Sequence, residues 1–346
     1  MLVRHVHVRA AALDDATFSS AVSAHLQIPN GLDGDEHTAF RAALDPFLSA
    51  AALAPYHERF RTIAAQLASR LPTGEPVDAV TQVGAVFAVR AQSAWLGWPA
   101  ELEQPLVDWV AENRAATRSG DGTRMAEVAA AFDALIRSVL APRRATSGAV
   151  VGDDVTAGLM RTTVKGRALT EEEIVSVLRN WTGGDLGSIA LCVGVIVHRL
   201  ATDMALQRHL RDGVGDAELD AVIDEILRID DPFVSNRRVT ACPVEIGGVS
   251  LPAGTRVRLN WTSANRDEAV FGDPDSFDPV GHAAHNLVYG IGRHACPGRL
   301  LSTIELRIAT RELLAATTAL SLAPDRPCSR EVFPAGGWAS VPIVLS

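Results

Sequence analysis

Lysine is nearly absent from this chain of 346 residues. Arginine supplies all but one of the 32 basic side chains, the exception being Lys165, and 41 acidic residues give a formal net charge of −9. Surfaces that bind nucleic acid or anionic membranes are typically rich in lysine and arginine and carry net positive charge. The composition therefore argues against general nucleic-acid binding and against a polybasic membrane surface.

Long apolar runs and paired cysteines are also missing. The longest apolar run, IALCVGVIV at residues 189–197, is too short to cross a bilayer. The chain starts with MLVRHVHVRAAALDD, which carries charges where a signal peptide has an apolar stretch. The four cysteines, at positions 192, 242, 296 and 328, show no paired spacing and predict no disulfide framework. We therefore expect a soluble, cytoplasmic protein.

What the sequence does contain is helical periodicity. Hydrophobic residues make up 47% of the chain, enough for a sizeable core. Beyond Pro232 the pattern alternates, with Gly-Gly and Pro-Ala-Gly turns, and predicts short antiparallel strands. A last helix follows Cys296, and a closing hairpin is predicted over 332–345. No repeat or long linker divides residues 1–346, so we expect one mostly α domain with a small β part. The other expected helices cover 35–71 with breaks near Pro46 and Pro55, 77–99, 102–140, 170–198 and 216–229.

One short segment, YGIGRHACPG at 289–298, places glycines, a histidine and a lone cysteine before the last helix. A zinc site would need a second pair of ligands, and a phosphate loop would need a strand–GxGxxG–helix order or a Walker lysine. A nucleophilic thiol needs an activating base, and the sequence does not show that His294 faces the sulfur. A thiolate that ligates iron fits better. Glycines let the backbone approach a flat macrocycle, and the N-terminus of the next helix stabilises the anion.

This segment resembles the haem-binding signature of the cytochromes P-450. The resemblance implies the P-450 fold, haem b as the cofactor and Cys296 as the proximal iron ligand. It also places Tyr289, Gly290 and Gly298 against the haem, although the family usually has phenylalanine where this chain has Tyr289. Pro297 removes one N–H group that could donate to the sulfur, so we expect a more electron-donating thiolate and a lower reduction potential.

Two stretches before this loop resemble the same family in the same order. The helix DEILRIDDP at 224–232 matches its Glu-x-x-Arg motif, which makes Glu225 and Arg228 a structural pair on one helical face. The stretch RRVTACPVEIGGVSLPAGTRV at 237–257 resembles the strands that follow. It places Arg238 where the family binds a haem propionate, a carboxylate that suits a guanidinium group.

Two further stretches extend the resemblance over essentially the whole chain. SANRDEAVFGDPDSFDP at 263–279 is close to the family's Ala-Asn-Arg-Asp and Asp-Pro-x-x-Phe stretch. DGDEHTAFR at 33–41 resembles the start of the helix that addresses the other propionate. The resemblance therefore implies His37 and Arg41 as propionate donors, and His294 is a third candidate.

The chain is short for this family. Residues 3–20 look like the strand and helix that normally follow an N-terminal segment of several dozen residues. We expect that segment to be missing, unless the sequence comes from a truncated gene. About sixteen residues separate Ser20 from His37, so the loop over the substrate is expected to be trimmed and the distal pocket open. The last arginine of the family's Glu-Arg-Arg set is also absent, and His282 is a candidate to replace it.

The distal helix departs most from the family pattern. The family usually shows Ala-Gly-x-Asp/Glu-Thr, in which the acid and the alcohol relay protons, whereas this chain has NWTGGDLGSIALCVG at 180–194. One alignment places Ser188 at the alcohol and Gly187 at the acid position, with Asp185 one turn earlier on the same face. Another places Asp185 at the acid position and Leu186 at the alcohol. Asp185 and Ser188 are the catalytic candidates, and the alternative is that Asp185 only helps to bend the helix.

The resemblance also implies an activity. The leading hypothesis is a haem-thiolate monooxygenase that oxidises a small-molecule or peptide-like secondary metabolite with O2. No flavin or iron–sulfur motif occurs, so ferredoxin and ferredoxin reductase are the expected electron donors. Oxidative cross-linking of aromatic side chains in a peptide is the runner-up, and a haem-binding protein without turnover is the alternative from another class. The expected substrate pocket is lined by Gly184, Ile189, Phe233, Val234, Ser235 and Trp338.

Overall fold

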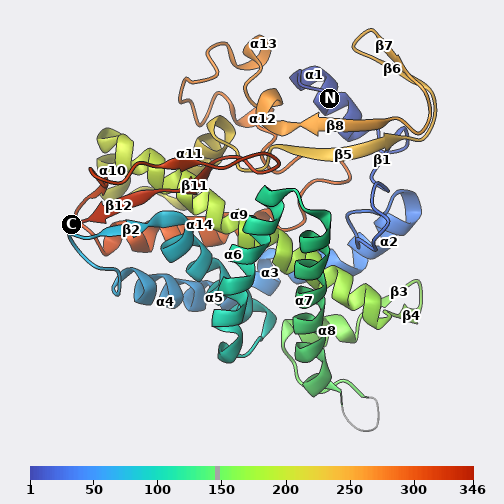
Figure 1. Ribbon diagram of the computed structural model, residues 1–346, viewed down its shortest axis with the longest axis horizontal. Helices are drawn as coiled ribbons and strands as arrows, with labels where there is room; N and C mark the ends of the chain where they lie inside the picture. The colour runs from blue at the N-terminus through green and yellow to red at the C-terminus, as the bar shows by residue number, and fades with distance from the viewer. Residues whose placement is uncertain (145–148) are drawn as a thin grey trace.

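The computed structural model describes residues 1–144 and 149–346. Helices form most of the molecule, and the strands lie in small antiparallel sheets (Figure 1). The helices are α1 (His5–Leu13), α2 (Gly34–Leu44), α3 (Ala50–Leu53), α4 (His57–Ala68), α5 (Ala85–Leu96), α6 (Glu103–Ser119), α7 (Gly122–Leu140), α8 (Val155–Met160), α9 (Glu171–Thr202), α10 (Met204–Arg211), α11 (Asp216–Ile229), α12 (Trp261–Ala264), α13 (Glu268–Phe271) and α14 (Arg299–Ala315). The mostly α prediction is confirmed.

Two of the sheets have three strands each. One has the order β1-β5-β8 and lies with α1 and α12, and the other has the order β2-β12-β9 near the C-terminus (Figure 1). The strands are β1 (Phe18–Ser19), β2 (Pro76–Asp78), β3 (Thr163–Val164), β4 (Arg167–Ala168), β5 (Ser235–Thr240), β6 (Val244–Ile246), β7 (Val249–Leu251), β8 (Arg256–Asn260), β9 (Leu320–Leu322), β10 (Ser329–Arg330), β11 (Trp338–Ser340) and β12 (Pro342–Leu345).

The long helix α9 runs through the core, and α5, α7, α11 and α14 pack against it. Its start is fixed by a capping box in which the Thr170 side chain and Glu173 satisfy each other's backbone N–H groups. Close packing needs glycine at one point, because a Cβ atom at Gly84 would lie 2.7 Å from the carbonyl oxygen of Ala190. Among the described residues α9 is the one helix long and apolar enough to span a membrane, and most of that stretch is buried inside the fold.

Three of the expected elements differ from the structure. The helix expected over 102–140 is two helices, because Gly120 takes a left-handed φ of +66° and Asp121 then caps α7. The helix expected over 77–99 begins as strand β2 and a π-helical turn before α5. The expected hairpin over 332–345 is wrong in its pairing. Strand β11 pairs with β10, and β12 lies between β2 and β9 because its Ile343 and Leu345 belong to the core.

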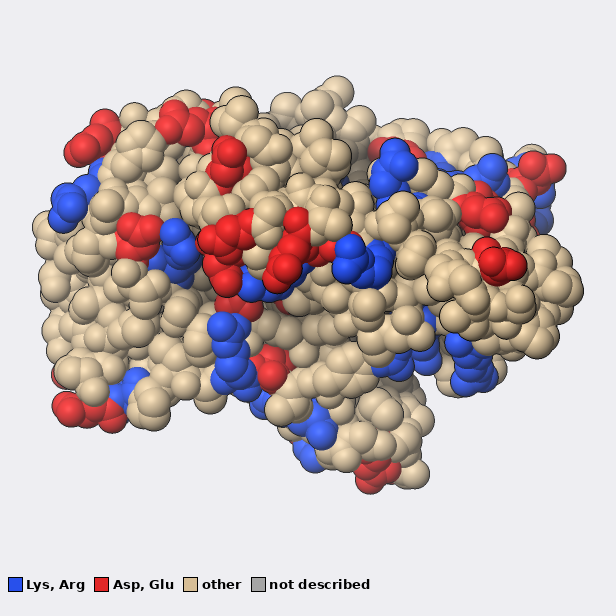
Figure 2. All heavy atoms as spheres, turned by 90° about the horizontal axis from the view of Figure 1, so that it is seen from above, with Lys and Arg blue, Asp and Glu red and all other residues tan. Residues whose placement is uncertain are grey.

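Charge is mixed over the surface. On the face seen in Figure 2, acidic side chains gather near the middle with basic side chains beside them, and most of the face is uncharged. Many charged side chains of the described residues belong to ion pairs, such as Arg307 with Asp220 at 2.7 Å and Arg311 with Asp216. The face in Figure 2 carries no continuous basic stripe.

Candidate active site

A cavity of about 270 Å³ lies between α9 and the segment that leads into α14. One wall carries Tyr289, Gly290 and Cys296, and the facing wall is formed by α9 with Asp185 and Ser188. The cavity thus brings together residues that are more than a hundred positions apart in the sequence. The predicted thiol and the predicted distal residues face the same space.

The cysteine loop is shaped by backbone geometry. Gly290 and Gly292 have φ of +66° and +78°, and a Cβ atom at Gly292 would lie 2.9 Å from the Ala12 carbonyl oxygen. The Cys296 N–H donates to the Tyr289 carbonyl oxygen at 2.9 Å, and the Gly298 N–H donates to the sulfur. Burial raises the pKa of Cys296 above its usual value, against the lowering effect of Gly298. The Gly298 N–H group at the start of α14 acts in the direction expected of a helix N-terminus, since it favours the thiolate.

Basic side chains gather at one edge of the cavity. The rings of His37 and His294 lie with their centroids 4.2 Å apart, and the His37 Nδ1 atom is buried without a hydrogen-bond partner. Burial, and then the neighbouring His294 and Arg41, lower the pKa of His37 to about 4. Arg238 is buried, and within the described residues its guanidinium donates only to the Arg237 carbonyl oxygen. This edge therefore holds donors that lack acceptors.

Arg41, the fourth predicted donor, is partly engaged elsewhere. Its Nε atom lies 2.6 Å from Asp45, and one terminal nitrogen donates to the carbonyl oxygens of Arg293 and Ala295 at 3.3 and 3.2 Å. Arg41 still lines the cavity. It ties α2 to the cysteine loop, so it positions the loop as well as facing the cavity.

The carboxyl groups of Asp185 on α9 and Glu305 on α14 lie close together at this side of the cavity. The Asp185 carboxylate accepts hydrogen bonds from the side chains of Gln92 on α5 and Ser302 on α14. Glu305, one turn after Ser302, is fully buried and faces Asp185. Burial raises the pKa of Asp185 to about 6, and burial together with the Asp185 charge raises the pKa of Glu305 well above its usual range. Sequence reasoning missed Gln92 and Glu305, whose only signal was a polar residue in an apolar helix face.

The two alignments of the distal helix differ in the structure. Ser188 lines the cavity, and its hydroxyl donates to the carbonyl oxygen of Gly184 one turn earlier. Leu186 is buried and is not among the residues that line the cavity. The arrangement therefore favours the alignment that places Ser188 at the alcohol position, with Asp185 one turn before it.

Half of the expected substrate pocket lies elsewhere. Gly184, Ile189 and Phe233 line the cavity, but Val234, Ser235 and Trp338 do not. Successive residues of a strand point to opposite faces, and in β5 it is Asn236 and Arg238 that face the cavity. Val234 instead packs near Gly336. Trp338 stacks on His198 at 4.0 Å and lies under the guanidinium of Arg330.

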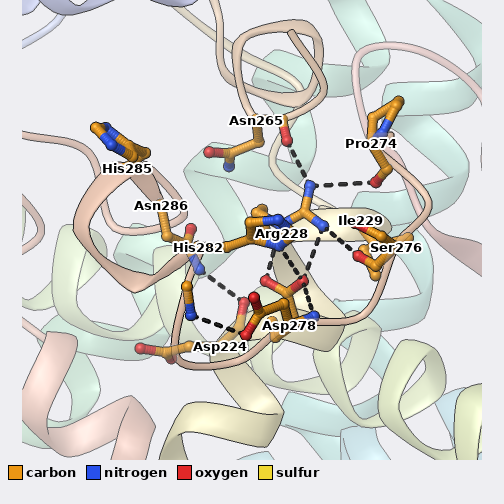
Figure 3. Close-up of polar contacts among 12 residues, drawn as sticks. Asp224, Arg228, Ile229, Asn265, Pro274, Ser276, Asp278, His282, His285 and Asn286 are labelled. Carbon is orange, nitrogen blue, oxygen red and sulfur yellow. Dashed lines mark hydrogen bonds and ion pairs between the residues drawn. The ribbon is translucent and has the colours of Figure 1, made fainter. Parts of the chain in front are cut away.

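The Glu-x-x-Arg pair braces the loop below the cavity. Arg228 is fully buried and binds both oxygens of Glu225 at 2.8 Å, and it donates to the carbonyl oxygens of Asn265, Pro274 and Ser276 (Figure 3). The His282 Nδ1 atom lies 2.7 Å from the same carboxylate. His282 thus shares the Glu225 carboxylate with Arg228, which is the contact expected of a residue that replaces the last arginine.

The chain is similar in sequence to members of a known family. The cytochrome P450 family model matches residues 218–326. The cyclomarin C epoxidase CymV of Salinispora arenicola is 30% identical over 325 residues, which cover 89% of this chain and 80% of that protein. The chain belongs to the cytochrome P450 family. The erythromycin C-12 hydroxylase of Saccharopolyspora erythraea is 28% identical over 93% of this P450 and 83% of the relative.

Solved structures confirm the P450 fold. The open form of P450 EryK from S. erythraea matches with a TM-score of 0.88 and 27% identity, covering 100% of this chain and 90% of that chain. HmtN, a hydroxylase of himastatin biosynthesis, shares the fold with a TM-score of 0.86 at 21% identity, covering 100% and 90% of the two chains. The relatives are monooxygenases, so this P450 is an oxidoreductase of the monooxygenase type.

The residues present fit the haem that the family carries. The cavity offers the Cys296 thiol, a glycine-flanked loop, and at its edge Arg238 and the unpartnered Nδ1 atom of His37, which suit carboxylates. Among the described residues no group of three or more His, Cys, Asp or Glu side chains could hold a bare metal ion.

Proposed function

We propose that this P450 binds haem b through the Cys296 sulfur and hydroxylates, or otherwise oxygenates, a bulky secondary metabolite. The observation that carries the proposal is the shared cavity, in which Cys296 faces Asp185 and Ser188 while Arg238 and the imidazoles of His37 and His294 line the edge. Haem bound there would supply the centre at which O2 is reduced and activated, and the thiolate would favour O–O cleavage. Arg238, His37 and His294 would hold the propionates.

The protein's own contribution is proton delivery. Asp185 has a pKa near 6, so at neutral pH it exchanges a proton more readily than an ordinary aspartate. Glu305 stays protonated behind it, and its hydrogen bond to Asp185 would help to hold that carboxyl group in place. The Ser188 hydroxyl donates to the Gly184 carbonyl oxygen, and its oxygen lines the same wall of the cavity. Asp185, which lines the cavity, would deliver the proton there and recover it from solvent, and the Ser188 oxygen would help to orient what the proton reaches.

The structure of the cavity roof favours a large substrate. The connection between β1 and α2, residues 20–33, is short, and its Pro29 and Asn30 reach the cavity beside Asn180 of α9. The side chains of Ser176 and Asn180 hold this connection against α9. The relatives include enzymes named for erythromycin and cyclomarin C. We infer a substrate of that general size, with ferredoxin and ferredoxin reductase as separate electron donors in the cytoplasm.

The thiolate is tested by the carbon-monoxide difference spectrum of the reduced protein. Native protein should show the red-shifted Soret band of thiolate-ligated haem, and Cys296→Ser should lose it. Cys328→Ser is the matched control, because Cys328 lies outside the cavity and should leave the band unchanged. An unchanged band in Cys296→Ser would overturn the proposal.

Product mass separates the candidate reactions. Gain of one oxygen atom supports monooxygenation, whereas loss of two hydrogens would support cross-linking of aromatic side chains, for which the short roof leaves room. If the reduced protein consumes no O2 in response to any substrate, the protein binds haem without turnover. Each of these outcomes counts only for protein that shows the band of thiolate-ligated haem.

A further inference from the structure

Three arginines without acidic partners lie on one face of the sheet β1-β5-β8. Arg237 of β5 stands directly opposite Arg258 of β8 in the sheet register, and Arg256 precedes Arg258 by two residues. Side chains alternate between the two faces of a strand, so all three project from the same face. Among the described residues none of the three forms an ion pair, and β5 and β8 contain no acidic residue.

The fold alone does not account for this cluster. Like charges directly opposite each other on two strands weaken the pairing of those strands. Charged side chains do protect the free edge of a sheet, and Arg256 and Arg258 lie on the edge strand β8. Arg237, however, lies on the central strand β5, where no edge needs protection. The opposed pair therefore suggests a negative group that is not part of the fold.

An exposed apolar patch adjoins the cluster. Val332 and Phe333, in the loop between β10 and β11, are 51% and 54% exposed, and neither lines the cavity. The Arg258 guanidinium lies over the Phe333 ring, 4.6 Å from its centroid. The acid of the same loop, Glu331, is turned away and bound by two arginines of α6. The surface beside Arg258 is therefore apolar and carries no free acid.

The patch is attached to the mouth of the cavity. Ala335 of the same loop pairs with Phe233, which lines the cavity and is half-exposed. Phe333 is two residues from Ala335, so the backbone positions of Phe233 and Phe333 lie within about 12 Å of each other. Apolar side chains thus lead from the cavity over Phe233 and Phe333 to Arg258.

We propose that Arg237 and Arg258 bind a carboxylate at the far end of the substrate, whose apolar part lies across Phe333 and Phe233 and enters the cavity. The inference rests on the proposed function, because it names a chemical class for the substrate of that same cavity. The planar fork of a guanidinium group matches a carboxylate, and a bound carboxylate offsets the repulsion between the two arginines. Both side chains are accessible, since Arg237 is exposed and Arg258 is half-buried. Exposed apolar patches of this kind mark interaction sites.

The test is a binding cycle by titration calorimetry on the haem-loaded protein. The probes are 8-phenyloctanoate and 8-phenyloctanamide, in which an amide NH2 group replaces one carboxylate oxygen. The test variant combines Arg237→Gln with Arg258→Gln. Arg9→Gln is the matched control, because Arg9 is also exposed and outside the ion pairs of the described residues. It lies on α1, whose Val8 packs with Val257 on the opposite face of the sheet.

We expect the double variant to weaken 8-phenyloctanoate binding about tenfold and 8-phenyloctanamide binding less than about twofold. Arg9→Gln should change neither affinity by more than about twofold. The short pair phenylacetate and phenylacetamide should show no such difference, because a short chain does not reach from the cavity to the arginines. Equal losses for both long probes, the same loss in Arg9→Gln or with the short pair, or no binding of 8-phenyloctanoate to native protein would overturn the proposal.

Thermal unfolding separates this role from a structural one. Because Arg237 and Arg258 repel each other, the double variant should unfold at the native temperature or above it. A fall of more than about 3 °C would show that the two arginines serve the fold, and would contradict the proposal.

Failure of this inference is distinguishable from failure of the proposed function. Native protein and both variants are first checked by the carbon-monoxide difference spectrum. If native protein lacks the thiolate band, the proposed haem site fails. If the band is present in all three and the binding cycle shows no preference for the carboxylate, only the role of Arg237 and Arg258 fails.

Discussion

Replacement of Arg228 by methionine should remove most of the stability of the fold. The guanidinium is fully buried and makes five hydrogen bonds, two to Glu225 and three to loop carbonyl oxygens from Asn265, Pro274 and Ser276 (Figure 3). Methionine has a similar length but no donors. The variant therefore leaves a buried carboxylate and three carbonyl groups without their partner.

The magnitude follows from these contacts. Removing one partner of a buried ion pair costs about 3–5 kcal/mol, and each buried acceptor that loses its donor adds about 1–3 kcal/mol. His282 and the Asp278 N–H group still reach Glu225, so the carboxylate is not entirely unpaired. We expect a loss of at least about 5 kcal/mol, which is comparable to the whole free energy of unfolding of many domains.

Urea unfolding followed by circular dichroism at pH 7 measures this loss. The double variant Glu225→Gln with Arg228→Met should be more stable than Arg228→Met alone, because it removes the unpaired buried charge. Arg59→Met, on the exposed face of α4, is the matched control and should change the free energy of unfolding by less than about 0.5 kcal/mol. A loss below about 1 kcal/mol in Arg228→Met, or a double variant less stable than the single one, would refute the reasoning.

Three further predictions concern pH. Asp185 titrates near pH 6 in the folded protein and lower in the unfolded chain, so its contribution to stability should fall as pH rises from about 4 to 6; Asp185→Asn should remove this contribution, so that its gain in stability over the native protein grows across this range to at most about 3 kcal/mol at pH 7 in thermal unfolding. The pKa of His37 is lowered to about 4, so its contribution to the free energy of unfolding of the haem-free protein should decrease as pH falls from about 6.5 to 4. In urea unfolding, His37→Gln should remove this part of the pH dependence. Hydrogen bonds from Arg118, the Val332 N–H group and Arg114 outweigh burial and lower the pKa of Glu331 to about 2, so its stabilisation of up to about 3 kcal/mol should be present above pH 4.5, vanish toward pH 2 and be absent in Glu331→Gln.

The sequence predicted where helices begin better than it predicted which strands pair. The cap at Thr170 is a local signal, and α9, α11 and α14 begin close to where periodicity places them. The pairing of β12 with β2 could not be read in this way. Those strands are more than two hundred and fifty residues apart, and the choice depends on which neighbour covers Ile343 in the core.

The site shows the same division between local and distant signals. The glycines before Cys296 favoured a loop whose backbone comes close to a flat macrocycle, and the left-handed turns at Gly290 and Gly292 are such a local feature. Which side chains of β5 face that cavity depends on register, and a shift of one residue exchanges Ser235 for Asn236. Glu305 carried no motif in the sequence, because its importance comes from contact with Asp185 across two helices.

The distribution of unpaired carboxyl groups links the fold to its chemistry. Below the cavity, Glu225 is held by an arginine and a histidine, and near the hairpin Glu331 is held by two arginines, so these acids fix structure. Asp185 and Asp231, which both line the cavity, have no basic partner among the described residues. Acids that serve only the fold gain by pairing, because burial of a lone charge is costly. Without a basic partner, burial favours the protonated acid at both positions, and at Asp185 this proton can be exchanged with the cavity.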